Sequence, residues 1–126
     1  MASPSDRKYS EEHVWVKKEG NYVSLGLTQH NIDTFGQVYS VSNLLGSDKE
    51  VIRGNSMGTL NRANDSDDFI APVNGNVADR DEHLFDIGGV NTDPYAAGSW
   101  FLKVDGVTQA DFDALMSGAK YDEFTQ

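Results

Sequence analysis

The first third of the chain alternates apolar and polar residues with a period of two, which is the pattern of half-buried β-strands. Two such segments, residues 13–17 and 22–27, lie on either side of the short polar sequence Glu19-Gly20-Asn21. Glycine within a polar break of this length is typical of a tight turn. The pattern therefore predicts that the chain opens with a β-hairpin.

A short helix is expected directly after this hairpin. Thr28 is a favourable N-cap residue for a helix over residues 29–34, and Phe35-Gly36 would end it. Alternation resumes afterwards and predicts another strand over residues 37–41.

The middle of the chain consists of short apolar segments separated by turn residues. The expected strands are residues 51–52, 57–60, 69–73 and 76–78, with a polar tip between the second and the third. Short strands at this spacing predict a sandwich or a barrel.

The last third begins with a loop rich in Gly, Asp and Pro, continues with an expected strand over residues 100–104, and then becomes helical. Thr108 and Asp111 have the spacing of a capping box, which marks the start of a helix. The apolar face expected for this helical end consists of Phe112, Leu115, Met116, Tyr121 and Phe124.

Length and composition exclude several classes of function for this chain. A chain of 126 residues fits one domain, and the absence of cysteine excludes disulfides and thiolate chemistry. The formal net charge of -10 would repel nucleic acid and anionic membranes. Because the first residues resemble neither a signal peptide nor a transit peptide, we expect a soluble cytoplasmic protein, or one from the mitochondrial matrix if a transit peptide has been removed.

Two short patterns imitate catalytic or metal sites. Gly54-Asn55-Ser56-Met57-Gly58 matches the Gly-x-Ser-x-Gly elbow of hydrolases, but the next residues predict a strand, whereas that elbow needs a helix. His13, His30 and His83 lack the spacing of metal ligands. We therefore expect no catalytic residues, no metal site and no enzymatic activity.

Four spaced motifs resemble those of the glycine-cleavage H-protein family. Residues 8–16, Lys-Tyr-Ser-Glu-Glu-His-Val-Trp-Val, are similar to the family's Tyr-Thr-x-x-His-Glu-Trp-Val. Further along the chain, Leu25-Gly26-Leu27-Thr28, Ala71-Pro72-Val73-Asn74-Gly75 and Asp93-Pro94-Tyr95 follow in the family's order. The resemblance extends from Tyr9 to Phe124.

This resemblance implies a mainly β fold, a barrel-sandwich hybrid of the lipoyl-domain type with two small antiparallel sheets, short helices and a helical C-terminal extension. Residues 1–8 would form an N-terminal tail and residues 9–126 the single domain. In this family the fold carries a lipoyl group that shuttles an aminomethyl group between the other proteins of glycine cleavage.

The residue that would carry the lipoyl group departs from the family pattern. A gapless alignment of the family's modified hairpin places Asn64 where the lipoyl-lysine belongs. The amide nitrogen of asparagine is delocalised and is not a nucleophile, so it does not accept the acyl group. Asn61 and Val14 stand where the family has a recognition glutamate and a glutamate that contacts the loaded arm, whereas Asp68 keeps the family's acidic residue.

These departures lead to a main hypothesis of a non-lipoylated module without a cofactor, acting through contacts with protein partners such as glycine-cleavage or other lipoate-related proteins. Its expected contact surface is the tip of the hairpin, formed by Asn61, Arg62, Asp65, Asp67 and Asp68.

The alternative hypothesis is an authentic glycine-cleavage H protein that carries the lipoyl group, either as an Asn64 variant or with the group attached elsewhere. Lys49 is the lysine nearest to a comparable turn.

Overall fold

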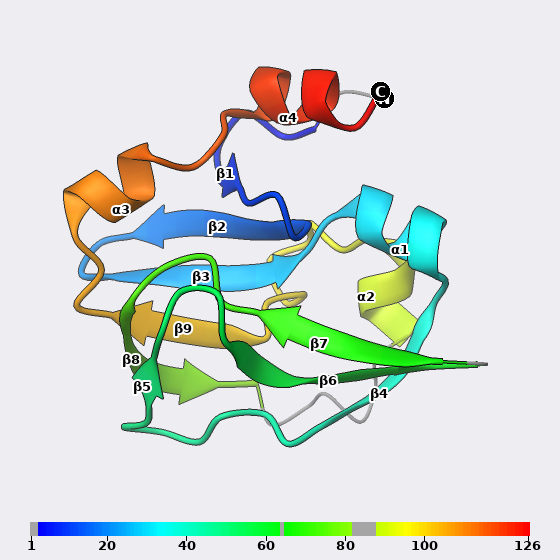
Figure 1. Cartoon of the computed structure of the whole chain (residues 1–126), viewed down its shortest axis with the longest axis horizontal. Coiled ribbons are helices and arrows are strands. Elements are labelled where there is room, and N and C mark those ends of the chain that lie inside the picture. The colour runs from blue at the N-terminus through cyan, green and yellow to red at the C-terminus, as the bar shows by residue number, and fades with distance from the viewer. Residues whose placement is uncertain (1–2, 64, 82–87) are drawn as a thin grey trace.

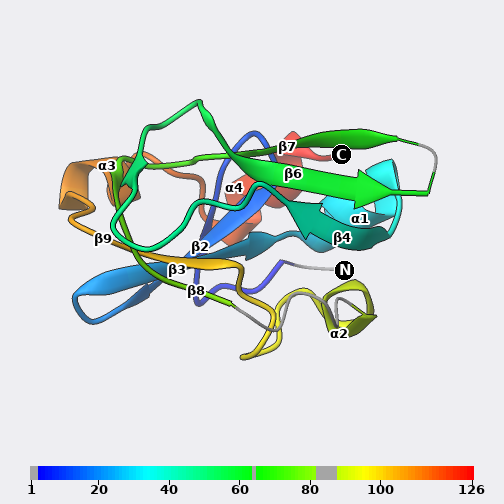
Figure 2. The same ribbon diagram turned by 90° about the horizontal axis from the view of Figure 1, so that it is seen from below.

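Two antiparallel sheets packed against each other form the body of the protein (Figures 1 and 2). The structure is a computed structural model that describes residues 3–63, 65–81 and 88–126. Its elements are, in chain order, β1 (Lys8–Tyr9), β2 (Val14–Glu19), β3 (Tyr22–Leu27), α1 (Gln29–Phe35), β4 (Val38–Ser42), β5 (Glu50–Val51), β6 (Ser56–Arg62), β7 (Ser66–Ile70), β8 (Gly75–Arg80), α2 (Gly88–Thr92), β9 (Leu102–Asp105), α3 (Gln109–Asp113) and α4 (Gly118–Phe124).

The larger sheet has six strands in the order β1-β2-β3-β9-β8-β5, and the smaller sheet has three in the order β4-β6-β7. Neither sheet closes into a barrel. The expected fold class, mainly β with two antiparallel sheets and short helices, is confirmed. None of the helices in the described part of the chain is long and apolar enough to cross a membrane.

The period-two pattern of β2 sends its side chains to two different hydrophobic clusters. Val14 and Val16 point into the main core between the sheets. Trp15, between them, points to the opposite face, where it packs with Tyr9 and Tyr121. The main core draws on both sheets and includes Leu25, Leu27, Leu60, Phe69, Phe101, Leu102 and Val104. Both faces of the larger sheet are therefore covered near β2.

The second cluster connects the start of the chain to its end. The rings of Tyr9 and Tyr121 stack with centroids 4.8 Å apart. The Trp15 indole donates a hydrogen bond of 2.9 Å to the Pro94 carbonyl. Figure 1 shows α4 lying over β1 on this side of the sheet. Packing against helix α4 thus stabilises the first strand.

Both expected helix starts are confirmed by their capping bonds. The Thr28 hydroxyl accepts from the Asn31 backbone N–H at 3.1 Å, and the Thr108 hydroxyl accepts from that of Asp111 at 3.1 Å. Helix α1 ends at Phe35, and Gly36 follows with a φ of 100°. A positive φ breaks the helical conformation, and glycine adopts it without the strain that a side chain would cause. Gly36 therefore ends the helix.

Other boundaries differ from the expectation. The strand expected over residues 69–73 ends at Ile70, because Pro72 has no N–H to donate and the Ala71 N–H instead bonds the Asn55 carbonyl at 2.9 Å. Strands β6 and β7 reach further into the polar tip than expected. Strand β1 was not expected, because its pairing with β2 depends on contacts that a two-residue segment does not encode.

A close approach between β2 and β3 generates a test of the second cluster. A Cβ added at Gly26 would lie 2.4 Å from the Trp15 indole ring, so Gly26→Ala must displace this buried side chain. We expect a loss of about 1–3 kcal/mol in the free energy of unfolding, measured by chemical denaturation. Gly46→Ala is the matched control, since nothing lies within 4 Å of its added Cβ. Equal stabilities of the two variants would contradict this account.

Candidate functional site

The hairpin formed by β6 and β7 is the segment in which the resemblance places the modified residue. Its strands pair antiparallel, with Thr59 opposite Asp68 and Asn61 opposite Ser66. The Arg62 N–H donates to the Asp65 carbonyl at 2.9 Å and closes the end of the ladder. Asn64 lies outside the described residues. The described parts of β6 and β7 form a hairpin that projects beyond the body of the protein (Figure 1), with a register irregularity between Ser56 and Gly58.

Arg62 was expected on the surface of the tip, and this expectation is wrong. The residue is only 8% exposed. Its guanidinium donates to both carboxylate oxygens of Asp67, at 2.7 and 3.3 Å, and to the Asn31 side-chain oxygen at 2.7 Å. It also donates to the Gly36 carbonyl. A charged group can be buried when its donors are satisfied in this way.

The partners of Arg62 explain where the hairpin lies. Asp67 belongs to the hairpin, whereas Asn31 belongs to α1 and Gly36 directly follows it. The guanidinium also lies 5.7 Å from the centre of the Phe35 ring, within the range of a cation–π interaction. One side chain therefore fixes the hairpin to helix α1.

The remaining predicted surface residues divide into two groups. The Asn61 amide donates to the Ser40 and Ser42 hydroxyls, at 3.1 and 2.8 Å, and so connects β6 to β4. Asp65, Asp67 and Asp68 are exposed, as expected. Among the described residues of the tip, the exposed charged groups are thus all carboxylates, because the nearby cation Arg62 is buried.

Val14 replaces the glutamate that, by the resemblance, contacts the loaded arm in the family. Val14 is 1% exposed and belongs to the main core, where it pairs with Leu27 on β3. The structure thus shows Val14 as a core residue. The loss of the glutamate's contact with the loaded arm at this position stays a prediction.

Ser56, the residue in the hydrolase-like pattern, begins strand β6 rather than a turn into a helix. Its hydroxyl donates to the Gly58 carbonyl at 2.9 Å and lies 3.4 Å from an Asp68 oxygen. These are contacts within one strand and its hairpin partner. They explain the serine as a local hydrogen-bonding residue.

A hydrogen-bonded chain that sequence reasoning missed lies beside the hairpin anchor. His13 Nδ1 is 2.7 Å from the Tyr121 hydroxyl, which is 2.8 Å from the Thr28 hydroxyl. Thr28 also accepts from the Asn31 N–H, and the Asn31 side chain binds Arg62. The chain of contacts therefore runs from the C-terminal helix through the cap of α1 to the hairpin.

Aromatic and imidazole rings gather around His13. The His13 and His30 rings lie 4.7 Å apart, and the Phe35 and Phe124 rings lie 5.9 and 6.2 Å from His13. Phe35 and Phe124 are 52% and 49% exposed. The spacing of these residues in the sequence contains no signal for this group, because α1 and α4 bring them together. His83 lies outside the described residues, and no cluster of metal ligands occurs among those described.

Burial lowers the pKa of His13 below its usual value, and the neighbouring His30 lowers it further. Neutral imidazole is also the form that accepts a hydrogen bond from Tyr121 through Nδ1. His13 has a φ of 64°, so its backbone adopts the left-handed conformation that few residues other than glycine and asparagine tolerate.

The anchoring role of Arg62 can be tested by removing its donors. Arg62→Leu would leave the Gly36 carbonyl and the Asn31 side-chain oxygen without their partner, so we expect a loss of about 1–3 kcal/mol in the free energy of unfolding. Arg80→Leu is the control, since Arg80 is exposed and, among the described residues, its side chain donates only to the Leu44 carbonyl. The free energy of unfolding of both variants is measured by chemical denaturation. A loss in Arg62→Leu no larger than that in Arg80→Leu would contradict the anchoring role of Arg62.

The lowered pKa of His13 predicts a dependence of stability on pH. Since the folded-state pKa lies below the unfolded value of 6.5, the unfolded chain takes up the proton first as the pH falls. This contribution is fully present above about pH 6.5 and is lost as the pH falls through the folded-state pKa. We expect His13→Asn, which tolerates the same φ, to lose less stability than the unsubstituted protein between about pH 7.5 and 5.5. The measurement is the melting temperature of each protein as a function of pH. An equal fall in melting temperature for the two proteins would contradict this prediction.

Comparison with known proteins identifies the family. The family model described as "Glycine cleavage H-protein" matches residues 7–126. Glycine cleavage system H proteins of Staphylococcus saprophyticus and Staphylococcus haemolyticus are each 36% identical over 124 residues, covering 98% of this chain and 97% of theirs. The crystal structure of a glycine cleavage system H protein from Mycobacterium marinum superimposes with a TM-score of 0.82 and 24% identity, covering 96% of this chain and 97% of the other.

These findings correct one expectation. The absence of a cofactor was inferred from Asn64, but homologous glycine cleavage H proteins carry a lipoyl group, and the match to them includes the entire β6–β7 hairpin. The family acts as a carrier and is not itself catalytic, in agreement with the expectation of no enzymatic activity. This chain belongs to the glycine cleavage H-protein family.

Proposed function

We propose that this chain acts as an authentic glycine cleavage H protein, a lipoyl carrier that shuttles an aminomethyl group between the other proteins of the system. The observation that carries the proposal is the family match over residues 7–126, supported by 36% identity to two curated relatives over nearly their full length. This function replaces the non-lipoylated module as the preferred hypothesis.

The geometry of the hairpin supports a carrier role. A two-stranded hairpin alone is marginally stable in water, so a tip that must present a carried group needs support from the rest of the fold. Here β4 pairs with one edge of the hairpin, and Arg62 binds it to α1. The tip is thus projected from a rigid base, as the exchange of a carried group between proteins requires.

Position 64 sets a condition on this proposal. Attachment of a lipoyl group requires an amine, which asparagine lacks. The chain is therefore either an Asn64 variant of a carrier with lysine at this position, or a carrier with the group on another lysine. We favour the first possibility, because the resemblance aligns position 64 with the lysine that the family modifies.

Lys49 is the strongest candidate for attachment elsewhere. It is exposed on the turn before β5, and its amine makes no hydrogen bond or ion pair with any described residue. However, β5 lies at the opposite end of the molecule from the hairpin tip (Figures 1 and 2). An arm on Lys49 would start far from the segment that the family uses.

The exposed carboxylates of Asp65, Asp67 and Asp68 suggest the chemistry of the partner proteins. With the Arg62 charge buried beneath them, these residues present a negative surface around the tip. Complementary charge accelerates encounter and excludes partners of the same sign. We therefore propose that the glycine-cleavage partners approach the tip with a basic surface.

Restoring the amine tests the proposed function. We expect Asn64→Lys to gain one lipoyl group from a lipoate-attaching enzyme and then to support aminomethyl transfer with the glycine-cleavage enzymes. Asn64→Arg is the matched control, because its guanidinium keeps the charge but is not acylated. Incorporation is measured by intact mass, and transfer by turnover of glycine.

Three outcomes separate the possibilities. An Asn64→Lys protein that stays unmodified, or is modified but inactive in transfer, contradicts the carrier proposal. A lipoyl adduct on the unsubstituted protein from its native source that disappears in Lys49→Arg places the attachment at Lys49 instead. Faster modification of the Asn61→Glu, Asn64→Lys double variant than of Asn64→Lys alone would assign a recognition role to position 61.

A further inference from the structure

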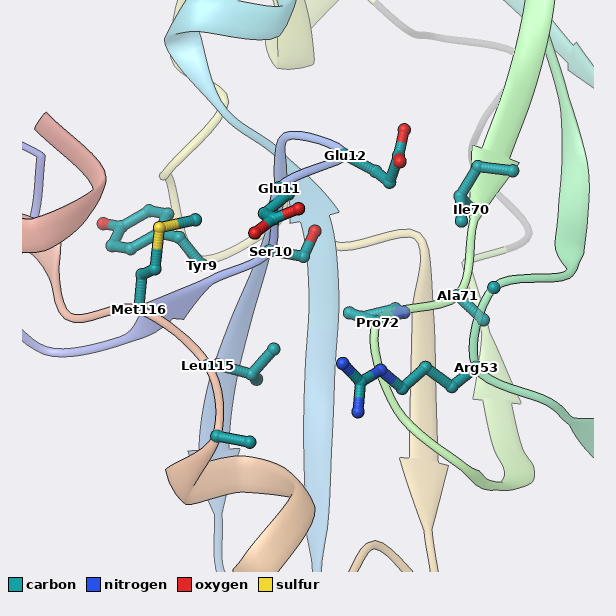
Figure 3. Close-up of a pocket in the computed structure, with 12 residues that line it drawn as sticks. Tyr9, Ser10, Glu11, Glu12, Arg53, Ile70, Ala71, Pro72, Leu115 and Met116 are labelled. Carbon is teal, nitrogen blue, oxygen red and sulfur yellow. The ribbon is translucent and has the colours of Figure 1, made fainter. Parts of the chain in front are cut away.

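A groove unrelated to the hairpin tip lies where the N-terminal turn, the end of β7 and the segment between α3 and α4 meet (Figure 3). Its volume is about 390 Å³. We call it the Arg53 groove and define it by the lining residues that matter here: Glu11, Glu12, Arg53, Ile70, Pro72 and Leu115. Ile70 is the last residue of strand β7, whereas the tip residues Asp67 and Asp68 lie in its first part and Asp65 precedes it. The groove and the tip are therefore separate surfaces.

Arg53 is the unusual residue of this groove. The other three arginine side chains hydrogen-bond within the protein, to Asp6, to Asp67 and to the Leu44 carbonyl. The Arg53 side chain is exposed and makes no hydrogen bond or ion pair with any residue that the structure describes. In a chain of net charge -10, a guanidinium without a carboxylate partner is available to an external anion.

The opposite charge lies at the other end of the groove. Figure 3 shows the Arg53 guanidinium reaching under Pro72 toward Leu115, while Glu11 and Glu12 lie at the other end of the groove, with their carboxylates pointing in different directions. Both glutamates are exposed, and neither forms an ion pair with Arg53. The groove thus holds a cationic end and an anionic end that do not neutralise each other.

Apolar side chains connect the two charged ends. Ile70 and Pro72 form one wall, and Leu115 faces them from the segment that follows α3 (Figure 3). Pro72 is buried, and Ile70 and Leu115 are partly exposed. A ligand that lies along this groove would cover apolar surface between two polar contacts, which is the usual composition of a small-molecule site.

We propose that the Arg53 groove binds a small zwitterionic aliphatic molecule of about dipeptide size. Its carboxylate would bind Arg53 through two parallel hydrogen bonds, and its ammonium group would face Glu11 and Glu12. Its aliphatic part would lie between Pro72 and Leu115. The volume of about 390 Å³ falls within the range of ligand pockets, and a ligand with one charge would leave one end of the groove unused.

Calorimetric titration of the full chain tests the cationic end and the anionic end of the Arg53 groove separately. The probes are the dipeptide Ala-Leu, its N-acetylated form, which lacks the ammonium group, and its C-amidated form, which lacks the carboxylate. We expect saturable binding of Ala-Leu with a Kd of about 1 mM or tighter, and about tenfold weaker binding of each capped form. Equal binding of all three probes, or no saturable binding of Ala-Leu, would overturn the proposal.

Substitutions locate the binding. We expect Arg53→Gln to weaken binding of Ala-Leu about tenfold and to remove the difference between Ala-Leu and its C-amidated form. Glu11→Gln combined with Glu12→Gln should remove the difference from the N-acetylated form instead. Arg80→Gln, an exposed arginine outside the groove, should leave binding unchanged. Unchanged binding in the Arg53→Gln protein would exclude the groove as the site. The binding measurements do not depend on lipoylation of the hairpin, so their outcome is separate from that of the carrier proposal.

Discussion

The buried guanidinium of Arg62 is the interaction on which the arrangement around the hairpin depends. A guanidinium leaves water at a high cost unless its donors are satisfied, and here the partners come from β7, from α1 and from the residue after α1. A slip of the hairpin by one residue would turn this side chain to the other face of the sheet. The requirement to satisfy one charge thus sets the register of the hairpin and its distance from the helix.

Helix α1 is held in turn by contacts with the end of the chain. Its cap residue Thr28 shares a hydrogen bond with Tyr121 of α4, and the same tyrosine contacts His13 and stacks on Tyr9. Residues near both ends of the sequence therefore support the helix to which Arg62 binds the β6–β7 hairpin. The last helix thus contributes to the position of the hairpin through α1.

Much of the fold could be predicted from local patterns. Alternation located β2 and β3 to within two residues at each end, and the hydroxyl residues Thr28 and Thr108 marked the helix starts that the structure confirms. Predictions failed where contacts between distant segments decide whether a residue is buried. Arg62 is a charged residue of a type usually found at the surface, and Val14 stands where the resemblance implies a glutamate. Both are buried, because burial depends on which elements pack above them. The grouping of His13 with His30 has the same origin.

By itself, the sequence determined most of the strands, the caps at Thr28 and Thr108, the family and the identity of residue 64, because backbone propensity, periodicity and covalent chemistry are properties of neighbouring residues. Only the tertiary structure decided that Arg62 anchors the hairpin, that Val14 belongs to the core, and that Arg53 faces two glutamates across a groove. These features join residues far apart in the chain. Their environment, whether desolvated, paired or open to solvent, exists only after the two sheets and the terminal helices have packed together.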